Sequence, residues 1–432
     1  MKVQKNIRHK KASFLPAKKP NSDDHFYDYY FPENELSLNL KERVMKYKAR
    51  LKPLSWQACC ISIAILFAVL VGINHYSLRH DRCQESSSLQ SLLAHFKSGS
   101  KIAFKGAFVG DIILGRSISQ IGKQYGYDFI FKYAKDYFTD CNYVLGNFEN
   151  PVLEDNKQYH KAAEKDILLS CSKNSLPSLK NAGFTLMGIA NNHMLDYGEE
   201  SCTDTLKAFD ESPLSIYVGA GKNLMEAANA VVEDFNGLNV STIALADSSI
   251  CFSYNAAQDD KTGVFLTSNK SPTYLEATAL AASSSDFVIV FIHWGREYTS
   301  TVSQRQRDIG RELIDAGADI VVGSHSHTLQ PVEIYRDGII FYSLGNFVFD
   351  QGWSRTKDSC LLRFALSLDG ERVFEAVPMR IENAQPAETK NPVFTKRIFR
   401  TLSKYLEKSS YKIENNRLYI YPPIFKEPGR MH

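Results

Sequence analysis

Residues 318–327 read ADIVVGSHSH, and they predict the end of a buried strand that carries two histidines. The apolar run from Ile320 to Val322 is typical of a strand buried on both faces. A glycine follows, and then His325 and His327 stand two residues apart. On extended backbone, side chains at this spacing share one face, so both imidazoles are expected to point into one pocket. Such a pair can bind a transition metal or polarise a phosphoryl oxygen, although a hydrogen-bonded turn can have the same spacing.

Short apolar runs alternate with helix-like segments from residue 101 onward. The clearest helix is predicted for residues 305–316, where Ile309, Leu313 and Ile314 share one face and Gly317 stops the helix. This alternation predicts a layered α/β fold with central β-sheets flanked by helices. The runs interpreted as strands are 102–109, 143–145, 184–189, 240–245, 287–292, 320–322 and 339–342.

Asp, Glu, Asn or His follows five of the predicted strands. Because ligands of α/β sheets bind outside the carboxyl ends of the strands, these side chains are expected to gather at one edge. Of the five histidines between residues 101 and 385, four stand at such positions, and only His160 does not. Each residue alone is more often a turn residue, but together they predict a binding site. The predicted metal ligands are Asp111, Glu149, Asn192, His293, His325 and His327, and the predicted catalytic residues are Asn192 and His193.

The residue types in this set favour a divalent metal ion. Carboxylate oxygen and imidazole nitrogen together suit Mn²⁺, Zn²⁺ or Fe better than Ca²⁺ alone. A carboxylate such as Glu149 is able to bridge two ions, which would then clamp the attacking and leaving oxygens of a displacement. Asn192 is a candidate to hold a metal or a substrate oxygen, and His193 is a candidate general acid or anion-orienting group.

Residues 53–78 contain no Asp, Glu, Lys or Arg, and their centre is almost wholly apolar. A helix of that length measures about 39 Å, enough to cross a hydrocarbon core of about 30 Å. The preceding residues 1–52 carry thirteen Lys/Arg and six Asp/Glu. The positive-inside rule therefore predicts a cytoplasmic N-terminus, a single-pass anchor in the cell membrane and an extracytoplasmic C-terminal domain. A buried core helix and a cleaved signal peptide are the weaker interpretations.

Charge and cysteine patterns limit the partners and the organisation. The basic residues 1–52 lie beside the predicted span, which favours contact with anionic lipid headgroups over nucleic acid. Six cysteines lie outside the span without a CxxC pair, so a zinc–thiolate site is not expected. The predicted organisation is a cytoplasmic tail over 1–52, an anchor over 53–78, a linker over 79–100, a folded domain over 101–385 and a C-terminal tail over 386–432 that either packs on the domain or extends from it.

Six short motifs, in this order, resemble those of the CapA family of capsule and poly-γ-glutamate synthesis proteins. The resemblance covers residues 101–385 and implies a layered metallophosphoesterase-like domain of the calcineurin-like superfamily. The motifs are Gly110-Asp111, Asn147-Phe148-Glu149, Asn191-Asn192-His193 with Asp196 and Gly198, His293-Trp294-Gly295 with Glu297-Tyr298, Gly323-x-His325-x-His327 with Gln330-Pro331, and Ser343-Leu344-Gly345-Asn346-Phe347 with Phe349-Asp350.

One part of the wider superfamily pattern is changed in this chain. Phosphoesterases of that superfamily open with Asp-x-His, whereas Asp111 is followed by Ile112 and Ile113. One histidine ligand is therefore absent, and the resemblance implies a modified or single-metal site.

The resemblance implies a membrane-anchored protein of capsule biosynthesis or export. Its expected partners are the membrane, other capsule-synthesis subunits and an anionic polymer such as poly-γ-glutamate, with no nucleic acid. Two alternatives stay open: an extracytoplasmic metal-dependent hydrolase of phosphoesters or γ-glutamyl amides, and a non-catalytic assembly subunit. Whether the domain is an enzyme stays open as well, with phosphoesterase-like hydrolysis as the candidate activity.

Overall fold

The computed structural model describes residues 89–155, 157–160, 165–268, 272–352 and 354–424. The predicted cytoplasmic tail, the predicted anchor over 53–78 and the first part of the predicted linker lie outside these ranges. Within the described ranges, no helix has both the length and the apolar character needed to cross a membrane.

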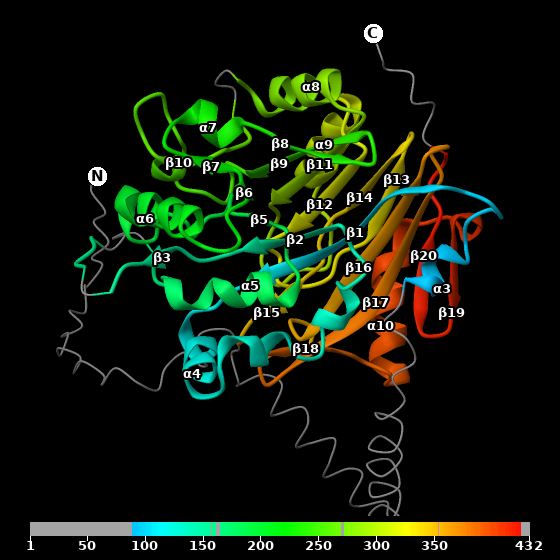
Figure 1. Cartoon of the computed structure of the whole chain (residues 1–432), viewed down its shortest axis with the longest axis horizontal. Coiled ribbons are helices and arrows are strands. Elements are labelled where there is room, and N and C mark those ends of the chain that lie inside the picture. The colour runs from blue at the N-terminus through cyan, green and yellow to red at the C-terminus, as the bar shows by residue number, and fades with distance from the viewer. Residues whose placement is uncertain (1–88, 156, 161–164, 269–271, 353, 425–432) are drawn as a thin grey trace, which may run out of the picture. The chain divides into compact units, whose positions relative to one another are not determined.

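Two large β-sheets form the framework of the domain (Figure 1). The first has the strand order β19-β20-β17-β16-β1-β2-β5-β6, with β15 paired to β1 and β18 paired to β17. The second has the order β13-β14-β12-β11-β9-β8. The strands of the first sheet are β1 Ile102–Ile112, β2 Tyr143–Phe148, β5 Leu186–Gly188, β6 Tyr217–Val218, β15 Asn346–Val348, β16 Asp358–Ser367, β17 Arg372–Glu382, β18 Gln385–Glu388, β19 Tyr411–Glu414 and β20 Arg417–Ile420. Those of the second are β8 Val231–Phe235, β9 Leu238–Ala246, β11 Phe287–His293, β12 Ile320–Ser324, β13 Val332–Tyr335 and β14 Gly338–Phe341.

The main core lies between the two sheets, as alternation along β11 shows. Phe287, Ile289 and Phe291 pack in the cluster that contains Phe104 of the first sheet, and the rings of Phe104 and Phe287 are 6.4 Å apart. The intervening residues Val288, Val290 and Ile292 belong to a second cluster. A strand with both faces buried needs apolar residues at every position, which explains why this run is continuously apolar.

Helices cover the outer face of the six-stranded sheet (Figure 1). Helix α9, Gln304–Asp315, packs Ile309 and Leu313 into the second cluster, and α8, Tyr274–Ser284, packs Ala277 and Ala281 there. Both helices begin with a capping box, in which an N-cap hydroxyl and the side chain three residues later satisfy backbone N–H groups reciprocally. The other α-helices among the described residues are α3 Gln90–Leu93, α4 Arg116–Tyr125, α5 Pro177–Ala182, α6 Gly198–Asp210, α7 Leu224–Ala228 and α10 Pro392–Leu402.

The layered α/β fold with central sheets and flanking helices is confirmed. Each of the seven predicted strands overlaps an observed strand, and the predicted helix over 305–316 is α9. The structure also places residues after 385 in the first sheet, because β20 pairs with β17 and β19 pairs with β20. Ahead of the predicted domain, α3 packs Leu92 against Ala365 and Tyr419 of the same sheet.

Parallel strands of both sheets end at one shared edge, which positions the site. In the first sheet, Asp111 is in register with Asn147 of β2 and with Asn346 of β15. In the second, His293 is in register with Ser324 of β12. The close approach of β15 to β1 requires glycine at 110, because a Cβ there would lie 1.7 Å from the carbonyl oxygen of Gly345.

Candidate metal centre

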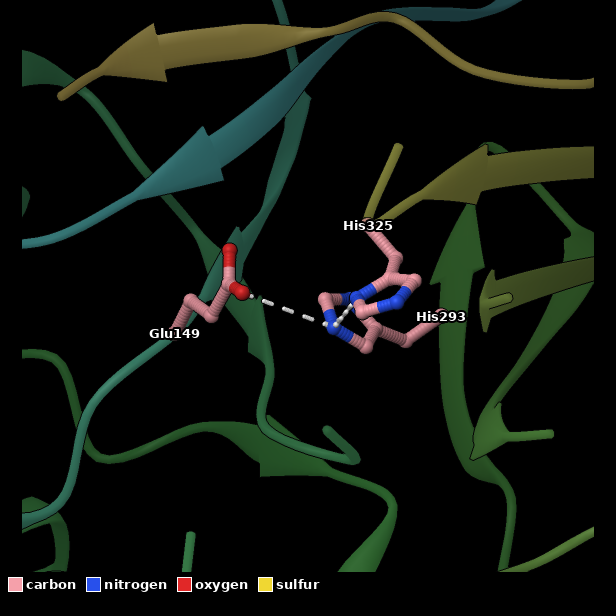
Figure 2. A group of neighbouring side chains, drawn as sticks. All are labelled: Glu149, His293 and His325. Carbon is pink, nitrogen blue, oxygen red and sulfur yellow. Dashed lines mark hydrogen bonds and ion pairs between the residues drawn. The ribbon is translucent and has the colours of Figure 1, made fainter. Parts of the chain in front are cut away.

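Two overlapping groups of buried ligand atoms lie at this edge. Glu149, His293 and His325 form one group, and Asp111, Glu149 and His327 form the other. Within each group the ligand atoms lie within 4.8 Å of one another. Figure 2 shows the first group, with the Glu149 carboxylate and the two imidazoles directed toward a common space. Because Glu149 belongs to both groups, its carboxylate would be a ligand in either one if the group held an ion.

Glu149 is the central residue of the site. It follows β2, its side chain is completely buried, and no described residue lies at hydrogen-bond geometry to either carboxylate oxygen. Burial, together with the charges of Asp111 and Glu297, raises the pKa of Glu149 well above its usual value. A buried acceptor without a partner is unfavourable in a folded protein, so this carboxylate fits a site that a cation completes.

His293 and His325 are placed as neutral ligands. His325 Nδ1 lies 3.0 Å from His293 Nε2, and that nitrogen lies 3.5 Å from Glu149 Oε1. Burial lowers the pKa of both imidazoles well below the usual value, and the neighbouring His327 lowers both further. The Asn192 Oδ1 atom lies 2.9 Å from His293 Nε2, so the predicted amide ligand reaches the same position.

Asp111 and His327 form the second position with Glu149. His327 Nδ1 lies 3.2 Å from Asp111 Oδ2, and His327 Nε2 lies 3.8 Å from Glu149 Oε1. Burial lowers the pKa of His327, but the hydrogen bond and charge of Asp111 and the charge of Glu297 outweigh it and raise the pKa above its usual value. Asn346 Oδ1 lies 2.9 Å from His327 Nδ1 and helps to orient the ring.

The two histidines share the site for a different reason from the one predicted. His325 has φ 88° and His327 has φ 53°, so both adopt the left-handed conformation and the extended alternation expected from their spacing is wrong. This conformation is rare for residues with a side chain, and such outliers concentrate at functional sites. The Asp111 carboxylate accepts from the backbone N–H of His325 at 3.2 Å and so supports the turn.

The His193 ring lies beside the candidate metal ligands, and Asp196 and Lys165 contact its Nδ1 atom. Its Nε2 lies 3.9 Å from Glu149 Oε1, and its Nδ1 lies 2.7 Å from Asp196 Oδ2. Lys165 contacts Asp196, lies 3.1 Å from His193 Nδ1 and donates to the Asn192 carbonyl oxygen at 2.8 Å. Burial lowers the pKa of His193, and the hydrogen bond and charge of Asp196 oppose this effect.

A cavity of about 230 Å³ opens onto this group. Its lining includes Asn192, His193 and His327, together with the cationic side chains of Arg116 and Lys165. Asp166 and Glu297 line the same cavity, so the site residues face solvent through a passage of mixed charge in which Arg116 and Lys165 are the cationic contacts for an anionic ligand.

The structure brings all seven predicted site residues together and adds five that were not predicted as site residues: Asn147, Lys165, Asp196, Ser324 and Asn346. Asn147 donates to Asp111 Oδ1 at 2.8 Å and helps to orient that candidate ligand. Ser324 Oγ lies 2.9 Å from His293 Nδ1 and helps to orient the His293 ring. Asn147 lies within a motif quoted above, and Asn346 follows a glycine in another. Lys165 carries no comparable signal, because it follows no predicted strand.

The donor set fits a divalent transition metal. Two carboxylates, three imidazoles and an amide oxygen converge, and the buried Glu149 oxygens have no other partner among the described residues. Imidazole with carboxylate suits Mn²⁺, Zn²⁺ or Fe, and nothing in this donor set distinguishes among them.

Residues 105–351 match the family described as "Bacterial capsule synthesis protein PGA_cap". The chain belongs to this family. It is 40% identical to the capsule biosynthesis protein CapA of Bacillus anthracis over 307 residues, which cover 70% of this chain and 73% of that one. It is also 40% identical to the PGA biosynthesis protein CapA of Bacillus subtilis (strain 168) over 324 residues, or 74% and 83% of the two chains. The resemblance found in the motifs is therefore confirmed.

Among solved structures, the calcineurin-like phosphoesterase YfkN from Bacillus subtilis aligns with 70% of this PGA_cap chain and 97% of its own. The TM-score is 0.33 and the sequence identity is 12%, so this likeness assigns no reaction to the present chain.

Proposed function

We propose that this capsule synthesis protein is a membrane-anchored component of the machinery that makes or exports an anionic γ-linked glutamate polymer. Its extracytoplasmic domain would use divalent metal to hold carboxylates of that polymer, in contact with other capsule-synthesis subunits. Family membership and the printed names of its 40% identical relatives support the pathway. The charge-free residues 53–78 and the basic residues before them support the anchor and its orientation.

The observation that carries the metal proposal is the fully buried carboxylate of Glu149, which two ligand groups share and which accepts no hydrogen bond from the described residues. One position would use Glu149 with His293, His325 and the Asn192 amide oxygen, and the other would use Asp111, Glu149 and His327. A bound divalent ion would supply a Lewis acid that holds carboxylate or phosphoryl oxygens.

The remaining residues of the cavity contribute orientation and charge. The Arg116 guanidinium lines the mouth beside Lys165 and favours an anionic ligand. Arg116 is also held by Asp350, whose carboxylate lies 3.2 Å from its Nε atom. Arg116 and Lys165 would therefore offer two cationic contacts to a polycarboxylate, in a lining that also contains Asp166 and Glu297.

The Asp196–His193 pair favours a second candidate, a metal-dependent hydrolase of phosphoesters or γ-glutamyl amides. Asp196 fixes the His193 ring through Nδ1, which leaves Nε2 facing the site. In that position His193 would donate a proton to a leaving oxygen or amine. Purified full-length protein loaded with Mn²⁺ or Zn²⁺ should then turn over a generic phosphodiester or a γ-glutamyl amide. His193→Ala should abolish turnover without loss of metal; no turnover by the loaded wild type favours the non-catalytic subunit.

The proposal is tested by Asp111→Asn and Glu149→Gln, which remove charge with little change in shape. Both variants should lose bound metal and stop capsule polymer production while the protein reaches the membrane at normal abundance. Normal polymer production in both variants would show that these carboxylates are structural. A reporter fused at the C-terminus should be active only outside the cytoplasm, and cytoplasmic activity would remove the anchor from the proposal.

A further inference from the structure

The outward face of α10 and the turn after it carries a row of positive charge remote in sequence from the metal ligands. Lys396, Arg400 and Lys404 recur every four residues, and all three side chains are exposed. At a helical rise of 1.5 Å per residue the row is roughly 12 Å long. We call these three residues the basic row.

The basic row differs from the basic residue beside it in its charge pairing, although Lys404 Nζ lies 5.6 Å from the centre of the Tyr405 ring. Arg397 turns inward and contacts Asp358, with Nε 2.5 Å from Oδ2. Among the described residues, no carboxylate forms an ion pair with any member of the basic row. Ile398, Phe399 and Leu402 are buried against the domain, so packing of the opposite face fixes the row toward solvent.

Charge is concentrated here against an acidic background. Residues 390–412 contain seven Lys/Arg and one acidic residue, Glu407, whereas residues 79–389 contain 28 Lys/Arg and 39 Asp/Glu. Clustering positive charge in one segment that follows the net acidic residues 79–389 costs repulsion energy within the cluster, and a polyanionic partner would relieve it.

We propose that the basic row binds an extended polycarboxylate chain, the same class of ligand as in the proposed function, on which this inference rests. A linear polyanion can meet all three charges at once, and the second and third contacts then form at high effective concentration. A membrane surface fits less well, because an interfacial helix exposes a broad apolar face. On α10 the apolar residues face the domain, and Val393 is the large apolar side chain left exposed.

The test compares purified full-length wild type with a triple variant, Lys396→Glu, Arg400→Glu and Lys404→Glu. Fluorescent poly-γ-glutamate should bind the wild type, more weakly at higher salt, and the triple variant at least about tenfold more weakly. A matched control reverses three exposed lysines elsewhere, Lys123, Lys173 and Lys222, and should bind within about twofold of wild type. Residues 1–52 are the same in all three proteins, so any binding by their positive charge is common to the wild type, the triple variant and the control.

A lysine-protection experiment on the wild type tests the proposal even if charge reversal perturbs folding of the triple variant. The polymer should protect Lys396 and Lys404 of the wild type from amine acylation, whereas monomeric glutamate should not. Equal binding by the triple variant, absence of protection, or binding only to anionic lipid vesicles would each overturn the proposal. Metal content measured on the same samples separates this result from the proposed function, since loss of the row should leave bound metal unchanged.

Discussion

Replacing Glu149 with glutamine should leave the metal-free protein at least as stable as the wild type, although the side chain is completely buried. Neither carboxylate oxygen of Glu149 has a hydrogen-bond partner among the described residues, and burial with the charge of Asp111 raises the pKa of Glu149. An amide of the same shape removes the like-charge contact and can donate to Asp111. A buried polar group without a partner costs about 1–3 kcal/mol, so the free energy of unfolding should rise by up to about that amount.

Glu375 provides a matched control because it is equally buried but fully partnered. Its Oε2 accepts from Arg363 Nε at 2.6 Å, and its Oε1 accepts from Tyr419 Oη at 3.2 Å and Ser91 Oγ at 3.1 Å. Glu375→Gln leaves the Arg363 guanidinium buried without its counter-charge. Breaking a buried pair in this way costs about 3–5 kcal/mol, the opposite sign to the effect expected at Glu149.

The assay is urea unfolding of purified full-length proteins, first with chelator and then with Mn²⁺ or Zn²⁺. An ion at 100 times its Kd should stabilise the wild type and Glu375→Gln by about 2.7 kcal/mol each. Glu149→Gln should gain little from either metal. The reasoning is refuted if metal-free Glu149→Gln loses as much stability as Glu375→Gln, or if metal stabilises it as strongly as the wild type.

Three further predictions follow from the site and its framework. His293→Ala and His325→Ala should each lower bound metal, measured by mass spectrometry, with an unchanged circular dichroism spectrum, and His160→Ala should bind as the wild type does. Because the pKa of Glu149 is raised above 4.5 in the folded metal-free state, that state holds more protons than the unfolded chain above this pH. The free energy of unfolding of the metal-free wild type, relative to Glu149→Gln, should therefore fall as pH rises. The affinity of the wild type for the metal should rise over the same range, because the ion displaces the proton from Glu149. Opposite slopes would contradict the role of Glu149 as a metal ligand. Gly110→Ala should lower the unfolding temperature and the soluble yield, because its Cβ would lie 1.7 Å from a backbone carbonyl oxygen.

The strand-end rule predicted much of the site because the local sequence carries its signal. Continuous apolar runs ended at Asp111, Glu149 and His293, and the observed register places these ends at one edge. Strands buried on both faces leave a one-dimensional pattern that single-sequence reasoning can follow.

The two longest strands of the meander after the site were not predicted, and their pairing explains why. Arg363 of β16 is in register with Glu375 of β17, and both side chains are fully buried as an ion pair. In the sequence each charge interrupts an apolar run, so the pattern resembles exposed loop. Only the partner strand shows that the two charges neutralise each other.

The role of Lys165 and the backbone conformation of His325 could not be predicted from the sequence either, because both depend on tertiary contacts. Lys165 reaches Asp196 across thirty residues with no strand or motif of its own. The left-handed conformation of His325 is supported by Asp111, which lies more than two hundred residues earlier. Contacts of this kind have no signature within a short sequence window.

The central position of β1 in its sheet has a consequence for biosynthesis. One edge pairs with β2, about forty residues later, but the other pairs with β16, where Ala107 meets Arg363. During synthesis at about 5–20 residues per second, the edge of β1 that pairs with β16 stays unpaired for on the order of ten to fifty seconds before β16 has been made. An open apolar strand edge is a template for association with other chains. Nascent copies should therefore depend on a chaperone until residue 367 has been made, and slowing translation between β2 and β16 should increase aggregation.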